Sequence, residues 1–157
     1  MNQKKTLTPE EALLKLQRFC AYQDRCHQDV RSKLIELGVY GDTLESVLAE
    51  LISDGFLNEE RFARSFVRGK FRIKRWGRQK IRQGLLQRQI PDAIIRIALQ
   101  EIDSEEYALT LAHLLDQKAA MLPPDEPGQR TQKLFAYAAS RGYETELIWE
   151  FLKEKNR

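Results

Sequence analysis

The stretch from Val30 to Leu51, VRSKLIELGVYGDTLESVLAEL, recurs as a pattern 51 positions later in IRQGLLQRQIPDAIIRIALQEI, which runs from Ile81 to Ile102. Eight apolar positions coincide: Val30, Leu34, Ile35, Val39, Leu44, Val47, Leu48 and Leu51 align with Ile81, Leu85, Leu86, Ile90, Ile95, Ala98, Leu99 and Ile102. Self-similarity at a fixed period of this length is typical of tandem structural repeats. We therefore expect the shared positions to be buried.

A third copy of the pattern lies in the last third of the chain. A shift of 104 positions aligns seven of the same positions with Leu134, Ala138, Ala139, Tyr143, Ile148, Phe151 and Leu152. Apolar residues recur at helical spacing, and no segment alternates as a half-buried strand would. The pattern predicts an all-α protein of three tandem three-helix repeats, at residues 1–57, 58–103 and 104–157. Because a unit of about 50 residues buries only a modest core, we expect the units to pack in an elongated, curved array.

Capping residues, prolines and glycines predict where the helices begin and end. Thr8-Pro9-Glu10-Glu11 is a capping box with proline at the first helical position. The predicted helices of the first unit cover about 9–22, 27–37 and 42–54, and those of the second cover 59–73, 78–88 and 91–102. In the third unit Ser104 begins a helix, the proline-rich stretch 122–128 is a loop, and two helices flank Gly142.

The charges of the chain are distributed unevenly. It has 26 basic and 23 acidic residues, but 61–90 contains eleven basic residues and no acidic one, which leaves 15 basic against 23 acidic elsewhere. The eleven are Arg61, Arg64, Arg68, Lys70, Arg72, Lys74, Arg75, Arg78, Lys80, Arg82 and Arg88. Such a concentration indicates a polyanionic partner, because several phosphates can be neutralised at once. The alternative is a solvated helix face, although such a face usually carries interleaved acidic residues.

Helical geometry groups five of these arginines. At 100° per residue, Arg61, Arg64, Arg68, Arg72 and Arg75 fall within an arc of about 80°, which we call the arginine stripe. Guanidinium groups suit phosphate because they can bind it with two parallel hydrogen bonds. The same arithmetic places Phe62, Phe66 and Ile73 on another face, the expected core side, and Phe71 beside the stripe.

Trp76 and Gly77 lie within the basic segment and allow two interpretations. Trp76 could stack on an unpaired base, or it could pack the turn against a neighbouring helix, which is the more common role of an aromatic residue next to glycine. Gly77 is most simply a break between two helices.

The sequence contains no recognisable catalytic constellation or phosphate loop, and we expect no enzyme activity, catalytic residue, metal or cofactor. The chain has two histidines, His27 and His113. The acidic pairs at the helix starts complement the helix dipole. Cys20 and Cys26 would lie about 9 Å apart along one helix, so we expect reduced thiols. No run approaches the roughly 20 apolar residues of a membrane span, so we expect a cytoplasmic protein and no membrane partner.

Two stretches resemble the RecX family of regulatory proteins, which modulate the recombinase RecA. They are GFLNEERFARSFVR at 55–68 and WGRQKIRQGL at 76–85, and a weaker match is DVRSKL at 29–34 with Gly38. The resemblance is clear from about Leu13 to Ile102 and extends to the last third only by architecture. Cys26 stands where the family usually has a capping serine, and Gln89 where the signature commonly has glycine.

The resemblance implies a protein that lies in the groove of the RecA filament on single-stranded DNA and lowers the ATPase and strand-exchange activities of RecA. Such a protein acts in homologous recombination, DNA repair and the SOS response. The expected partners are RecA and single-stranded DNA, with duplex DNA as a further candidate, and we expect a monomer. The eleven basic residues and Trp76 are the candidate surface for DNA or for acidic RecA groups, and the sequence does not separate these two partners.

Two other classes of protein remain open at this point. Three-helix units also host the helix-turn-helix motif, so the chain could be a transcription factor that binds duplex operators. It could instead be a repeat adaptor that contacts only proteins. Sequence-specific duplex binding would favour the first alternative, and binding that is insensitive to salt would favour the second.

Overall fold

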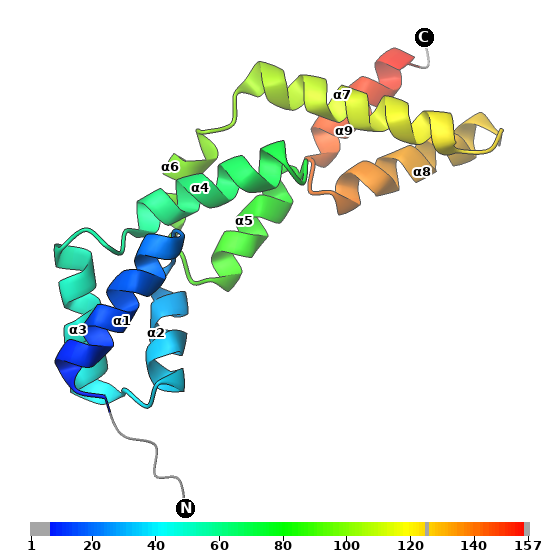
Figure 1. Ribbon diagram of the computed structural model, residues 1–157. Helices are drawn as coiled ribbons and strands as arrows, with labels where there is room; N and C mark the ends of the chain where they lie inside the picture. Colours follow the sequence, from blue (N-terminus) through cyan, green and yellow to red (C-terminus); the bar gives the residue numbers. More distant parts are fainter. Residues whose placement is uncertain (1–6, 125, 156–157) are drawn as a thin grey trace, which may run out of the picture.

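The computed structural model describes residues 7–124 and 126–155, which form nine α-helices and no strand. The helices are α1 (Pro9–Tyr22), α2 (His27–Glu36), α3 (Gly41–Ser53), α4 (Glu59–Arg72), α5 (Arg78–Gln87), α6 (Asp92–Leu99), α7 (Ser104–Met121), α8 (Pro127–Ser140) and α9 (Thr145–Lys155). They follow one another in groups of three along an elongated, bent array (Figure 1). The expected all-α array of three-helix repeats is confirmed.

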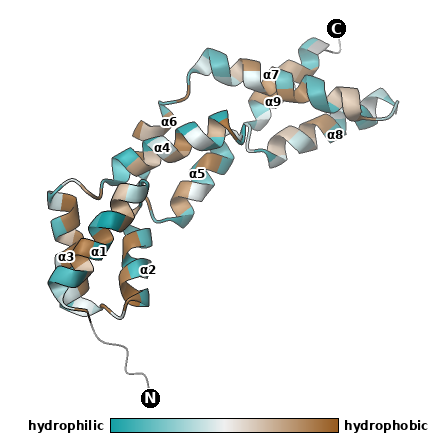
Figure 2. Ribbon diagram, viewed as in Figure 1, coloured by the Kyte–Doolittle hydropathy of each residue, from teal (hydrophilic) through white to brown (hydrophobic). Residues whose placement is uncertain are grey.

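The apolar faces of the helices form two buried clusters. Figure 2 shows that the helices carry hydrophobic and hydrophilic residues mixed along their length. The first three helices have a cluster of their own, around Leu16, Leu34 and Leu51. The second cluster runs through the other six helices, from Phe62 to Leu152, and also includes Cys26 at the start of α2. The last two units therefore share a core, which Cys26 connects to the first unit, while the other buried apolar residues of the first unit form a cluster of their own.

The repeat seen in the sequence is a repeat of buried positions. Most residues that coincide at shifts of 51 and 104 are buried, as expected. The same shift of 51 also relates α1 to α4, because Ala12, Leu16 and Cys20 are buried at the positions of Ala63, Val67 and Phe71. The expectation is wrong for Ile35 and Leu86, which are 50% and 48% exposed. Each follows a buried leucine by one residue, and a step of about 100° turns it away from the core.

Local capping signals placed several helix ends correctly. The Glu11 backbone N–H donates to Thr8 Oγ1 at 3.1 Å, and the Arg61 N–H donates to Asn58 Oδ1 at 2.8 Å. Helix α7 begins at Ser104, as expected, and its cap is Asp103, since the Glu106 N–H donates to Asp103 Oδ2 at 2.9 Å. Pro127, expected in the loop, is the first residue of α8, a position that suits its missing N–H.

Other ends differ by a few residues from the expected ones. Helix α3 begins at Gly41, one residue before the expected start, and α6 ends at Leu99, three residues before Ile102. Cys26 is the N-cap residue of α2, and its sulfur is a weak hydrogen-bond acceptor. Its backbone N–H donates to Asp29 Oδ2 at 3.1 Å, so Asp29 and the burial of Cys26 hold this helix start. Gln89 has φ +60°, a left-handed conformation that glycine adopts far more readily than glutamine.

Candidate functional site

Five of the eleven basic residues are paired with carboxylates. Arg61 Nε lies 2.9 Å from Asp24 Oδ1, and its two terminal nitrogens donate to the backbone oxygens of Gly55 and Phe56. The other pairs are Arg64 with Glu101 (2.8 Å) and Glu60 (3.2 Å), Arg68 with Glu101 (3.4 Å), Arg78 with Glu144 (2.9 Å), and Arg82 with Asp92 (2.7 Å). These arginines hold helices and units together in the isolated chain.

The pairing corrects the interpretation of the arginine stripe. The sequence places no acidic residue between 61 and 90, but α4 packs against α6 and brings Glu101 between Arg64 and Arg68. Hydrogen bonds, first from Arg64 and then from Arg68, hold the pKa of Glu101 below its ordinary value. Three of the five arginines of the stripe are therefore paired with carboxylates that come from outside the segment 61–90.

At the C-terminal end of the stripe, the positive charge is not balanced by carboxylates of the described residues. Arg72 and Lys74 are exposed, and neither has an ion pair within the described ranges 7–124 and 126–155. Arg75 contacts Gln117 Oε1 at 3.5 Å, and its own backbone oxygen accepts a hydrogen bond from the Tyr143 hydroxyl at 2.9 Å. Arg72 and Lys74 are thus available to an external anion.

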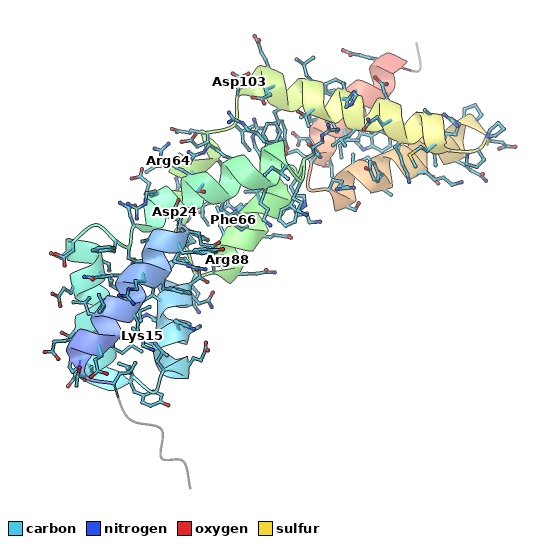
Figure 3. All side chains as sticks on the ribbon, in the orientation of Figure 1. Lys15, Asp24, Arg64, Phe66, Arg88 and Asp103 are labelled. Atoms are coloured by element: carbon cyan, nitrogen blue, oxygen red, sulfur yellow. The ribbon has the colours of Figure 1, made fainter. Side chains whose placement is uncertain are left out.

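On the α5 side of α4, cations alternate with two aromatic rings. The order is Arg88, Phe66, Lys70, Trp76 and Lys80, which we call the cation–aromatic ladder. Arg88 and Lys70 lie 4.8 and 5.4 Å from the Phe66 ring centroid, and Lys70 and Lys80 lie 4.7 and 4.6 Å from the Trp76 ring. Figure 3 shows Phe66 and Arg88 close together, with Arg64 on the other side of α4. None of the three cations is paired with a carboxylate within the described part of the chain.

The core face of α4 differs from the one that helical arithmetic suggested. Phe71, expected beside the arginines, is 3% exposed and packs 5.9 Å from the Tyr107 ring, whereas Ile73, expected in the core, is 79% exposed. Phe66 is only partly buried and belongs to the ladder. Trp76 is packed against the second core cluster while lysines cover its ring, so the packing alternative describes it in the isolated chain.

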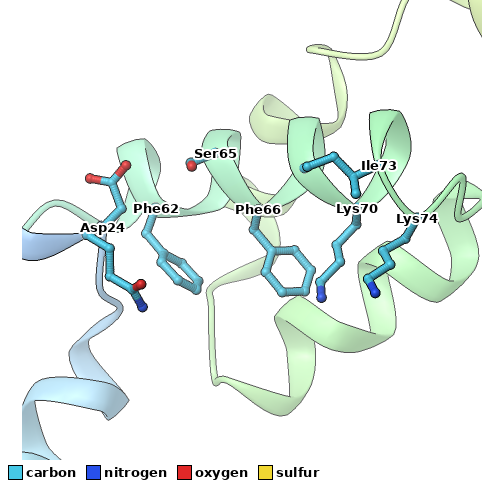
Figure 4. Close-up of a pocket in the computed structure, with 9 residues that line it drawn as sticks. Asp24, Phe62, Ser65, Phe66, Lys70, Ile73 and Lys74 are labelled. Atoms are coloured by element: carbon cyan, nitrogen blue, oxygen red, sulfur yellow. The ribbon is translucent and has the colours of Figure 1, made fainter.

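A pocket of about 330 Å³ lies against the face of α4 that carries Phe66 and Lys70. Its walls include Phe62, Phe66 and Ile73, and its cations are Lys70 and Lys74. Figure 4 shows Phe62, Phe66, Lys70 and Lys74 in a row along α4, with Asp24 at one end. Among the lining residues that the structure describes, Asp24 is the single acidic group, and it is already paired with Arg61. The pocket therefore offers aromatic surface and unpaired positive charge together.

Other candidate chemistry is not assembled. Cys20 and Cys26 are buried free thiols, as expected, and burial raises the pKa of Cys26 to about 11. Across 7–124 and 126–155 the structure holds no group of three or more His, Cys, Asp or Glu residues placed to bind a metal ion. Within the same ranges, no helix is both long and apolar enough to cross a membrane.

Comparison with known proteins places this geometry in a family. The family model for the second three-helix domain of RecX matches residues 58–99, and the model for the third three-helix domain matches 105–152. The chain belongs to the RecX family. It is 32% identical over 136 residues to the regulatory protein RecX of Prosthecochloris aestuarii, and the aligned region covers 87% of each chain. The family is one of regulatory proteins.

More distant members are longer. The chain is 31% identical over 121 residues to regulatory protein RecX of Clostridium perfringens strain SM101 and 27% identical over 145 residues to that of Bacillus mycoides. It spans only 56% and 54% of their lengths. Two solved structures share the fold at a TM-score of 0.85: RecX from Lactobacillus salivarius, 20% identical and covering 93% of this chain and 95% of that one, and a second RecX, 23% identical and covering 93% and 71%.

Proposed function

We propose that this chain binds the RecA nucleoprotein filament and lowers its ATPase and strand-exchange activities, without enzyme activity of its own. RecX proteins are named as regulatory proteins, and the expected target is the RecA filament on single-stranded DNA. In this proposal the three units at 1–57, 58–103 and 104–157 act together, because an elongated array can contact several repeated partners at once.

The observation that carries the proposal is that the basic residues of the middle unit fall into two groups, one paired with carboxylates and one unpaired. Arg61, Arg64, Arg68, Arg78 and Arg82 are paired with carboxylates, whereas Lys70, Arg72, Lys74, Arg75, Lys80 and Arg88 have no carboxylate partner among the described residues. Three members of the second group, Lys70, Lys80 and Arg88, lie against the rings of Phe66 and Trp76. Unpaired cations with aromatic rings suit single-stranded DNA, because phosphates meet the cations and bases meet the rings.

The decisive experiment is the DNA-dependent ATPase of RecA with and without this protein. We expect the rate to fall as the protein is added, with inhibition that weakens as salt is raised. An unchanged ATPase over the same range would contradict the proposal. A transcription factor would instead bind one duplex sequence in preference to others, and an adaptor without DNA contacts would show no binding to oligonucleotides at any salt concentration.

A further inference from the structure

Each of the three units has an open pocket along its first helix. The pocket of the first unit lies between α1 and α2, that of the second lies between α4 and residues 23–24 of the link between α1 and α2, and that of the third lies between α7 and α8. Their volumes are about 470, 330 and 580 Å³. The helix pairs follow one another along the array (Figure 1).

The buried positions define which residues correspond. The shift of 51 relates α1 to α4, and a shift of 48 relates α4 to α7, because Ala63 and Val67 fall on the buried Leu111 and Leu115. These shifts align Tyr22, Ile73 and Met121, each of which lines its own pocket. They are 83%, 79% and 78% exposed. A large apolar group thus stands in solvent at the same rim position in all three units.

Every pocket is also lined by both members of a cation–aromatic pair. In the first unit the Arg25 guanidinium lies 3.7 Å from the Phe19 ring centroid, and in the third unit Lys118 Nζ lies 5.0 Å from the Tyr137 ring. The pair of the second unit is Lys70 with Phe66. Among the described residues that line the three pockets, Asp24 alone is acidic, and Arg61 pairs with it.

The first-unit pocket adds cations that lie outside the basic segment 61–90. Lys15 and Arg18 are exposed on α1 and have no ion pair among the described residues, while Lys33 pairs with Glu36 at 3.4 Å. This pocket also adjoins that of the second unit, because Tyr22 and Arg25 line one and Gln23 and Asp24 line the other. A flexible strand can therefore pass from one pocket to the next over residues 22–25.

We propose that the pocket along the first helix is one repeated site, which binds unpaired nucleotides of single-stranded DNA in each unit. Cations meet the phosphates, while the ring and the exposed rim residue offer apolar surface to a base. An acidic peptide has charge but no base to stack, and a duplex keeps its bases inside. The proposal rests on the proposed function only in taking single-stranded DNA as the ligand.

The test uses the full chain, without RecA, and a fluorescein-labelled oligo-dT observed by fluorescence anisotropy. Tyr22→Ala should weaken binding about tenfold, as loss of one stacking partner does, and Met121→Ala should weaken it less. The double variant should lose the product of the two factors, because the residues lie in separate units. Tyr22→Phe should retain the wild-type affinity. The control is Leu109→Ala, which removes a 71% exposed apolar residue of α7 that lines none of these three pockets.

Equal affinity of the Tyr22→Ala, Met121→Ala and Leu109→Ala variants for oligo-dT would overturn the inference. It would also be overturned if Tyr22→Ala weakened binding of a duplex or of polyglutamate as much as binding of oligo-dT, because neither presents unpaired bases. The ATPase of RecA is measured separately. If the protein inhibits RecA but the variants bind oligo-dT as tightly as the wild type, only the repeated site is refuted. If the variants lose oligo-dT binding as expected but the protein does not inhibit RecA, only the proposed function is refuted.

Discussion

The backbones of Gly77 and Gly142 touch where the second unit meets the third. The Gly77 N–H donates to the Arg141 oxygen at 2.7 Å, and the Gln79 N–H donates to the Gly142 oxygen at 2.9 Å. A Cβ atom on Gly77 would overlap the Gly142 carbonyl group, and one on Gly142 would overlap Lys80. Gly77 is therefore more than the helix break that its sequence context suggested, because it allows two backbone segments of the chain to approach closely.

Gly77→Ala should destabilise this junction by about 1 to 3 kcal/mol, because the new methyl group must displace backbone atoms. Urea denaturation followed by circular dichroism measures the loss. Gly69→Ala is the matched control: a Cβ there meets no atom within 4 Å, and Gly69 lies inside α4. The control should therefore gain up to about 1 kcal/mol from helix propensity. A Gly77→Ala variant as stable as the wild type would show that the junction is not closely packed.

Leu85 and Leu86 are neighbours with opposite environments. Leu85 is fully buried, whereas Leu86 is 48% exposed. Leu85→Ala should lower the free energy of unfolding by roughly 2 to 5 kcal/mol, since it leaves a cavity. Leu86→Ala should cost less than about 1 kcal/mol. Leu99, which the repeat pattern also marked as core, is only partly buried, so its truncation should fall between the two. Similar losses at Leu85 and Leu86 would contradict the burial pattern.

Gln89 occupies a backbone conformation that favours glycine. Its φ of +60° brings the Cβ too close to the backbone, a strain of about 1 to 2 kcal/mol. Gln89→Gly should therefore stabilise the protein, although the greater freedom of glycine in the unfolded chain reduces the gain to about 1 kcal/mol or less. Gln87→Gly, in the last turn of α5, should have the opposite sign. Thermal unfolding of the two variants compares them, and a lower melting temperature for Gln89→Gly would refute the argument.

Local signals in the sequence predicted more of this molecule than did its charge pattern. The caps at Thr8 and Asn58 depend on residues within one turn, so they could be predicted without knowledge of the fold. Glu101 is 37 residues from Arg64, and only the packing of α4 on α6 brings the two together. For the same reason, helical arithmetic alone could not tell that Phe71 is buried and Ile73 exposed, because both faces of α4 carry apolar residues.

Glu101 should make stability depend on pH. Its pKa is held below the ordinary value of 4.5 by Arg64 and Arg68. A carboxyl whose pKa is lower in the folded state contributes stability above the unfolded pKa and loses it as the pH falls through the folded pKa. Glu101→Gln should therefore be less stable than the wild type near pH 7, and the difference should shrink below about pH 4. Urea denaturation at several pH values tests this.

The control for Glu101 is Glu150→Gln on α9. Glu150 is exposed and has no ion pair among the residues that the structure describes. Its replacement should change stability little at any of these pH values. A Glu101→Gln variant whose deficit persists unchanged in acid would show that the loss arises from packing and not from the ion pairs.

The paired and unpaired arginines should also differ in their effects on binding. Reversal of Arg68 would place a carboxylate against Glu101, so an Arg68 and Arg72 double reversal would mix loss of binding with damage to the α4–α6 contact. Arg72→Glu with Lys74→Glu avoids this, because both side chains are exposed and have no ion pair among the described residues. The double variant should weaken binding to oligo-dT and inhibition of RecA by at least about tenfold at low salt, and less as salt is raised.

The matched control is Lys4→Glu with Lys5→Glu, which makes the same change in net charge at two positions outside the described residues. Both double variants should keep the helical circular dichroism and the melting temperature of the wild type. Loss of binding and of inhibition in the Arg72 and Lys74 variant alone assigns the function to this end of α4. Equal loss in both variants would show that net charge alone matters, and full activity in both would exclude Arg72 and Lys74 from the binding surface.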